Sequence, residues 1–154
     1  MEALLFDVGD KRFGVQLRNV REVVRAVKLS PLPQAPDIVE GLLNLRGRIL
    51  PVIDVRRLFS LDSRKIRHTD YFIVVATDER TLALHVDVAI DLVQLAGCDV
   101  QAASTVLPQT GLIDFVAKTS DGLVHVIDIE RLAAMEGTLS AAALVESQTE
   151  GPST

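Results

Sequence analysis

Two aspartates are the first candidates for chemistry in this chain. Asp54 and Asp128 each directly follow a Val-Ile pair at the end of a short apolar run. Two carboxylates brought together could act as the acid and the base of a hydrolase. Each aspartate also precedes a segment with helical spacing, where its side chain would accept hydrogen bonds from the first helix amides. We therefore predict that both aspartates cap short helices, and a hydrolase that uses them is kept as an alternative.

The remaining groups that could serve as nucleophiles or metal ligands are scattered. The three histidines, His68, His85 and His125, lack the i, i+4 spacing of a metal pair, and we interpret them as structural or solvent-facing residues. Cys98 has no basic neighbour that would activate its thiol. The sequence contains no GxSxG, GxxxxGK[ST], GxGxxG or HExxH motif. We therefore expect no enzymatic activity, no catalytic residues, no metal site and no cofactor.

An internal repeat organises the elements that position these residues. Short segments of the first half return in the same order in the second half, at offsets of 70 to 75 residues, which is longer than the period of solenoid repeats. The repeat predicts two similar units: lobe one over about 4–60, a polar connection over 60–70, and lobe two over about 71–136. Residues 137–154 are expected to form a flexible tail. The matching segments are Leu32-Pro33-Gln34 with Leu107-Pro108-Gln109, Gly41-Leu42-Leu43 with Gly111-Leu112-Ile113, and Val52-Ile53-Asp54 with Val126-Ile127-Asp128.

The local patterns within the lobes favour strands. Alternating apolar residues over 4–17 surround a Gly-Asp-Lys turn, which indicates a hairpin, and residues 73–86 repeat this pattern. Residues 20–27 fit either a short amphipathic helix or a helical turn that leads into a strand. Two strands over 41–45 and 48–53 are expected to join through Arg46-Gly47, and the stretch over 88–110 is expected to be irregular.

Composition and charge exclude several classes of protein. The chain has 154 residues, is 48% apolar and holds one cysteine, which indicates a folded protein of a reducing compartment such as the cytoplasm. No segment approaches the roughly 20 apolar residues that a membrane span needs. The net charge is −5, which opposes general binding to nucleic acid. Residues 1–70 carry 13 Lys and Arg against 9 Asp and Glu, whereas residues 71–154 carry 3 against 12. This polarity either reflects drift of surface charge without a function or suits a contact between unlike lobes of neighbouring modules.

Arg46 is the most distinctive polar residue, because it occupies the tip of an otherwise apolar hairpin and has no counterpart in the second copy. Such an arginine is either a solvated side chain or an interface anchor. A small-molecule or nucleic-acid binding β-barrel is the alternative function. For nucleic acid it has little support, because aromatic residues make up only 4% of the chain and tryptophan is absent.

These residues resemble the CheW-type coupling proteins of bacterial chemosensory systems. The segment from Asn44-Leu45-Arg46-Gly47 to Ile49-Leu50-Pro51-Val52-Ile53-Asp54 is similar to the NLRG motif and the strand that follows it in that family. The resemblance covers about residues 3–135. Two positions depart from the family pattern: Ala89 replaces a larger aliphatic residue, and His125 interrupts a strand that is usually apolar. Further matches are Phe6, Gly9, Phe13-Gly14-Val15, Val20-Arg21-Glu22-Val23, Val86-Asp87 and the segment 121–128.

The resemblance implies a mainly β protein with two five-stranded, SH3-like β-barrel subdomains packed on a shared core, with short helices. It also implies a non-enzymatic adaptor that couples chemoreceptors to the histidine kinase CheA. The implied partners are the regulatory domain of CheA and the cytoplasmic tip of methyl-accepting chemoreceptors, with recruitment to receptor arrays at the membrane. The positions that the motif match assigns to partner binding are Val20, Glu22, Asn44, Arg46 and Gly47.

Overall fold

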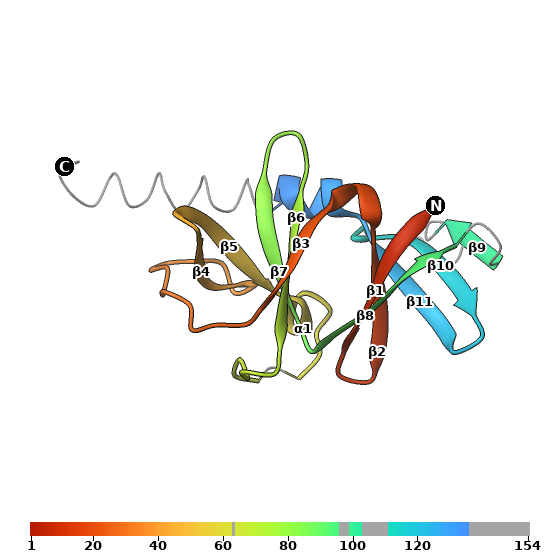
Figure 1. Ribbon diagram of the computed structural model, residues 1–154, viewed down its shortest axis with the longest axis horizontal. Coiled ribbons are helices and arrows are strands. Elements are labelled where there is room, and N and C mark those ends of the chain that lie inside the picture. Colours follow the sequence, from red (N-terminus) through yellow and green to blue (C-terminus); the bar gives the residue numbers. More distant parts are fainter. Residues whose placement is uncertain (63, 96–98, 103–110, 136–154) are drawn as a thin grey trace.

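The computed structural model describes residues 1–62, 64–95, 99–102 and 111–135. These residues form two sheets of mostly antiparallel strands with few helical turns, so the predicted mainly β class is confirmed. The two sheets lie side by side (Figure 1). The predicted tail, Cys98 and the Leu107-Pro108-Gln109 repeat lie outside the described residues. None of the described helices is long and apolar enough to cross a bilayer.

The five-stranded sheet has the order β3-β6-β7-β5-β4. All its pairs are antiparallel except β5 with β7, where Val52, Ile53 and Asp54 lie opposite Ala83, Leu84 and His85. The four-residue helix α1 (Val55–Leu58) follows β5 directly. The strands of this sheet are β3 (Val20–Arg25), β4 (Val39–Leu45), β5 (Arg48–Asp54), β6 (Tyr71–Ala76) and β7 (Thr81–Val86).

The second sheet has six strands in the order β8-β1-β2-β11-β10-β9. Its one parallel pair joins β2 and β11, with Phe13, Gly14 and Val15 opposite His125, Val126 and Ile127. Residues 129–135 continue from β11 as a helix. The strands are β1 (Glu2–Val8), β2 (Lys11–Gln16), β8 (Val88–Gln94), β9 (Asp99–Ala102), β10 (Ile113–Thr119) and β11 (Gly122–Ile127).

The sheets do not follow the two consecutive halves that the repeat predicts. The hairpin β1–β2 from the first half completes the sheet of the second half, and the hairpin β6–β7 from the second half completes the sheet of the first (Figure 1). The repeat itself is preserved, because the parallel pairing of β5 with β7 has its counterpart in that of β11 with β2. The two halves are therefore related by an exchange of hairpins.

Two segments differ from the expectations based on the sequence, namely the connection over 60–70 and the stretch over 88–110. The segment 60–70 links α1 to β6 within the five-stranded sheet, so it is not the passage between sheets. The chain instead crosses at the 3-10 turn η1 (Leu17–Asn19) and again at Asp87, between β7 and β8. Residues 88–94 form the edge strand β8 rather than the irregular segment predicted, and β9 gives the second sheet six strands instead of five.

Three apolar clusters hold the fold together. The largest draws Phe6 and Val15 from one sheet and Ile73 and Leu84 from the other, so the sheets share a central core, as predicted. Two smaller clusters belong to one sheet each: one includes Leu5 and Val126, and the other includes Leu43, Val52 and Phe72. Removing large apolar side chains from water is the main force that stabilises such a fold. The closed SH3-like barrel form of each sheet stays a prediction.

Residues 20–25 illustrate how the local ambiguity of the sequence is resolved. They form strand β3, whose side chains alternate between half-buried and exposed, and the helical turn precedes them at Leu17–Asn19. Of the two structures that the pattern left open, the turn that leads into a strand is confirmed. The valines of this segment favour a strand, because β-branched side chains restrict the helical conformation.

Candidate functional site

The predicted turn between β4 and β5 is present and presents Arg46 to solvent. Leu45 and Arg48 are the last paired residues of the two strands, and Arg46 and Gly47 form the turn between them. Both turn residues have positive φ angles, 52° and 87°, as a two-residue hairpin turn requires. Asn44 Oδ1 accepts a hydrogen bond of 2.9 Å from the Gly47 amide, which fixes the turn. The Arg46 side chain is 69% exposed.

The Arg46 guanidinium forms an ion pair with the Glu22 carboxylate. Glu22 lies on β3 and Arg46 lies at the tip of the β4–β5 hairpin, so the contact joins the first and the last strands of the sheet order. Three more predicted residues can be placed with respect to it: Asn44 and Gly47 form the same turn, whereas Val20 packs against the central core. We refer to Glu22, Asn44, Arg46 and Gly47 as the turn cluster.

Exposed apolar side chains accompany the turn cluster, and the sequence pattern did not single them out. Ile49 is 55% exposed and lies directly opposite Asn44 across the hairpin. Val23 is 38% exposed and follows Glu22 on β3. Protein–protein contacts commonly contain an arginine guanidinium beside apolar side chains that are exposed to solvent in the free protein.

Asp54 and Asp128 both act as helix caps, as predicted. Asp54 Oδ1 accepts hydrogen bonds from the amides of Arg56 and Arg57, at 3.0 and 3.4 Å. Asp128 Oδ1 accepts one from the Arg131 amide at 3.1 Å. Each carboxylate therefore has a local structural partner at the start of a helix. Asp54 is the last residue of β5 and Asp128 directly follows β11, and these strands belong to different sheets, so the geometry does not pair the two aspartates as an acid and a base.

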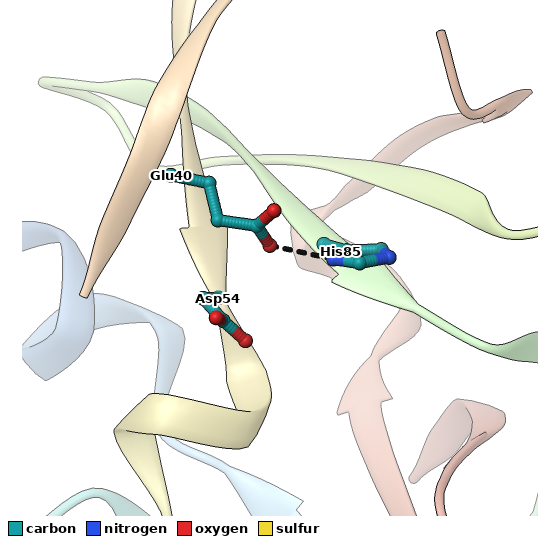
Figure 2. A group of neighbouring side chains, drawn as sticks. All are labelled: Glu40, Asp54 and His85. Atoms are coloured by element: carbon teal, nitrogen blue, oxygen red, sulfur yellow. Dashed lines mark hydrogen bonds and ion pairs between the residues drawn. The ribbon is translucent and has the colours of Figure 1, made fainter. Parts of the chain in front are cut away.

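A second polar arrangement was missed in the sequence and centres on His85, a buried residue of β7. His85 Nδ1 lies 2.5 Å from Glu40 Oε1 (Figure 2). Its Nε2 lies 2.7 Å from Asp70 Oδ2. Ionised carboxylates only accept hydrogen bonds, so two ionised carboxylate partners require both ring nitrogens to donate, as they do in the protonated imidazolium. His85 is therefore best described as a buried cation between two carboxylates.

The contacts of His85 continue toward the second sheet. Arg64 binds both oxygens of Asp70, at 2.7 and 2.8 Å, and also reaches Asp87 Oδ1 at 2.5 Å. Arg56 of α1 lies 2.6 Å from Asp87 Oδ2. Three carboxylates thus alternate with three cations, and we call this set the charge chain. In order, its members are Glu40, His85, Asp70, Arg64, Asp87 and Arg56.

Asp87 connects the charge chain to the six-stranded sheet. Its Oδ2 accepts a hydrogen bond of 2.7 Å from the amide of Gly9, which lies in the β1–β2 turn. Its own amide donates to the Asp7 carbonyl at 2.9 Å. Because Asp87 lies where the chain leaves the five-stranded sheet, these bonds fix one sheet relative to the other.

The electrostatics of the charge chain follow from burial and pairing. Burial by itself would raise the pKa of Asp70, but hydrogen bonds from Arg64, the Arg67 amide and His85 outweigh it and hold that pKa well below its usual range. Burial would lower the pKa of His85, but the hydrogen bonds with Glu40 and Asp70 outweigh it and raise that pKa. Both shifts favour the charged forms.

The group formed by Glu40, Asp54 and His85 is a candidate metal site by distance alone, because its donor atoms lie within 4.8 Å of one another. Figure 2 shows the Glu40 carboxylate turned toward His85, with Asp54 beside them at the start of α1. Each His85 nitrogen already has a carboxylate partner, and Asp54 Oδ1 holds the helix amides. Each residue of the group therefore already has a partner within the protein, and we describe the group as structural.

The other histidines lie in ordinary positions. His68 is exposed in the segment before β6, and the half-buried His125 ring lies 6.1 Å from that of Phe13. Ala89 is half-buried on β8, opposite Phe6 of β1. The two departures from the family pattern are thus accommodated in the six-stranded sheet.

Comparison with known proteins agrees with the fold. The sequence model of one protein family, described as a CheW-like domain, matches residues 2–137. A relative from Treponema pallidum, named Chemotaxis protein CheW, is 26% identical over 137 residues, which cover 85% of this chain and 81% of the relative. A protein of the same name from Helicobacter pylori is 23% identical over 128 residues, 82% and 78% of the two chains. The crystal structure of the scaffolding protein TtCheW from Thermoanaerobacter tengcongensis superimposes with a TM-score of 0.73 at 26% identity, and the match covers 82% of this chain and 88% of that one.

Proposed function

The chain belongs to the CheW-like domain family, and on this basis we propose that it is a non-enzymatic scaffold of a bacterial chemosensory system. The observation that carries the proposal is the extent of the family match, which spans both sheets rather than a single motif. Relatives named for chemotaxis and a superimposable scaffolding protein support it. The capping roles of Asp54 and Asp128 remove the main reason to consider a hydrolase.

The proposed partners are the regulatory domain of the kinase CheA and the cytoplasmic tip of a chemoreceptor. We assign the contact with these partners to the turn cluster and Val20. The proposed location is the cytoplasm, beside receptor arrays. The rigid turn supports this assignment, because it holds an arginine in place at small entropic cost. The exposed Ile49 beside it adds an apolar surface that a partner would cover.

The distribution of charge supports assembly between unlike surfaces. Residues 17–86, which contain the five-stranded sheet, carry 12 Lys and Arg against 8 Asp and Glu, a balance of +4. Residues 1–16 and 87–135, which contain the other sheet, carry 4 against 10, a balance of −6. The polarity inferred from the two sequence halves therefore persists after the exchange of hairpins. Opposite charges on the two sheets would favour a contact of one sheet with the other sheet of a neighbouring module.

A binding experiment with purified components tests the proposal. The chain should bind an isolated CheA regulatory domain and a receptor signalling fragment, and adding it should couple kinase activity to the receptor. Autophosphorylation of CheA with receptor, with and without the chain, is the functional measurement. Tight binding of RNA or a metabolite, combined with no binding to the regulatory domain, would instead favour a ligand-binding β-barrel.

A further inference from the structure

A basic groove lies beyond the end of β3, away from the turn cluster. It is lined by residues 26–29 and 65–68 and by Glu40. Glu22, which pairs with Arg46, lies near the start of β3, whereas the groove begins with Ala26, after the last residue of the strand. The groove is therefore a separate surface, and a ligand for it can be inferred independently of the proposed function.

Four cationic or titratable side chains line the groove. Lys28, Lys65, Arg67 and His68 are all exposed. Among the described residues, no hydrogen bond or ion pair engages the side chains of Lys28, Lys65 or His68. The chain as a whole is acidic, with a net charge of −5, so a group of unpaired cations on one surface is a local reversal of the overall charge.

The less exposed lining of the groove is apolar. Ala26 is buried, and Leu29 and Ile66 are half-buried against the apolar cluster that includes Leu43 and Phe72. Val27 lies at the same surface and is 52% exposed. A ligand that covered these side chains would gain apolar burial in addition to ion pairs.

Glu40 is the one acidic residue among the described residues that line the groove, and its charge is compensated. Its carboxylate lies 2.5 Å from Nδ1 of His85, the buried cation of the charge chain. Glu40 therefore does not cancel the positive charge of the groove lining. None of the described residues that line the groove is aromatic, so a nucleic-acid base would find no ring among them on which to stack.

From this arrangement we propose that the groove binds an acidic polypeptide segment of a partner protein, with an apolar side chain placed against Val27, Leu29 and Ile66. The carboxylates of the segment would pair with Lys28, Lys65 and Arg67. Charge complementarity selects the acidic segment, and the apolar lining favours a peptide over a small inorganic anion.

Fluorescence anisotropy with three synthetic peptides tests the proposal on the intact chain. The first is a labelled peptide of glutamates around a central Leu-Leu pair, the second replaces its glutamates with glutamine, and the third replaces its leucines with serine. We expect the first peptide to bind at least about tenfold more tightly than either of the others, because only it supplies both charge and an apolar anchor. Its affinity should fall as the salt concentration rises.

The variant Lys28→Glu combined with Lys65→Glu locates the site. It should weaken binding of the first peptide by at least about tenfold. Lys11→Glu combined with Lys118→Glu makes the same charge change at exposed positions of the other sheet and should alter the affinity by less than about twofold. Arg46→Glu should likewise leave peptide binding unchanged, which separates this site from the proposed coupling surface. Titration with the first peptide should shift the amide NMR signals of Val27 and Ile66. The thermal unfolding of all variants should be unchanged, which shows that they remain folded.

Several results would overturn the proposal. They are equal binding of the glutamine peptide, full affinity in the double variant, or no binding of the first peptide at about 1 mM. A single-stranded RNA that bound more tightly through the same lysines would identify a nucleic-acid surface instead. Self-association of the native chain that disappeared in the double variant would identify the groove as a contact between copies.

Discussion

His85 Nε2 lies 2.7 Å from Asp70 Oδ2, and both side chains are only 2% exposed. A buried cation and a buried anion are tolerated because each has a second partner: Glu40 for His85 and Arg64 for Asp70. Removal of one member would leave a charge in the protein interior without compensation, which is far more costly than the loss of an exposed ion pair. The charge chain therefore makes the stability of the protein sensitive to pH and to single substitutions.

The first prediction concerns stability at neutral and alkaline pH. The folded state raises the pKa of His85, so its stabilising contribution is complete below the ordinary histidine value of about 6.5 and is lost as pH rises through the folded value. Urea unfolding between about pH 6 and 9 should show this loss, and His85→Gln should abolish it. His68→Gln is the matched control at an exposed position and should keep the native profile. Parallel curves for the native chain and His85→Gln would contradict the prediction.

The second prediction concerns acid. The pKa of Asp70 is lowered in the folded state, so its contribution is present above the ordinary aspartate value of about 3.9 and is lost as pH falls through the folded value. Asp70→Asn should destabilise the protein by about 3 kcal/mol at neutral pH, because Arg64 and His85 would lose their shared anion. It should also weaken the acid dependence. Asp62→Asn, at an exposed position, should leave both quantities nearly unchanged in the same unfolding series.

The third prediction concerns the junction of the sheets. Asp87→Ala removes the acceptor shared by Arg56, Arg64 and the Gly9 amide, and it should lower the free energy of unfolding by about 2 kcal/mol. Hydrogen exchange of the Gly9 amide should accelerate more than that of amides within β6. Asp91→Ala, which loses a contact with its neighbouring amide only, should not change exchange at Gly9. Unaltered Gly9 exchange in Asp87→Ala would show that this bond does not hold the sheets together.

The fourth prediction concerns the turn cluster. Arg46→Glu should leave folding intact, because its exposed pair with Glu22 contributes less than about 1 kcal/mol. It should weaken pull-down of the kinase regulatory domain or the receptor fragment. The double variant Arg46→Glu with Glu22→Arg restores the pair but not the position of the guanidinium, so it should remain defective if Arg46 contacts the partner directly. Normal pull-down by Arg46→Glu would count against the assigned surface.

The fifth prediction concerns the shape of that turn. Gly47 has a φ of 87°, and a Cβ built there would meet no atom within 4 Å. Gly47→Ala should therefore destabilise the protein by about 1 kcal/mol through backbone strain alone. Gly41→Ala is an informative comparison, because a Cβ there would lie 2.7 Å from the Ser30 carbonyl oxygen and should cost more. Thermal unfolding of the two variants measures the difference, and equal melting temperatures would contradict it.

The local features of the fold could be predicted from sequence because their causes are local. A carboxylate that follows a strand and precedes a helix has amides within reach, so the caps at Asp54 and Asp128 were predicted correctly. The Arg46-Gly47 turn was predicted for the same reason, since glycine readily adopts the backbone conformation that the turn requires. The mainly β class and the shared core of the two units were predicted from the family resemblance rather than from local patterns.

Long-range features were beyond this reasoning. Alternating apolar residues identify the hairpin β1–β2, but periodicity does not reveal which sheet it completes, and the pairing of β2 with β11 spans most of the chain. His85 stands alone in an apolar run, and its partners Asp70 and Arg64 lie in a segment whose composition resembles an ordinary polar connection. Only the folded chain brings them together.

The exchange of hairpins has a consequence for the integrity of the chain. A backbone break within residues 60–70 would yield one fragment with β1 to β5 and another with β6 to β11. The first fragment would lack the hairpin β6–β7 of the five-stranded sheet, and the second would lack the hairpin β1–β2 of the six-stranded sheet. Neither fragment could complete its sheets alone, but the two fragments together could fold into the native structure by complementation. Two unbroken molecules could also trade their hairpins reciprocally and form an intertwined dimer that keeps every native strand pairing.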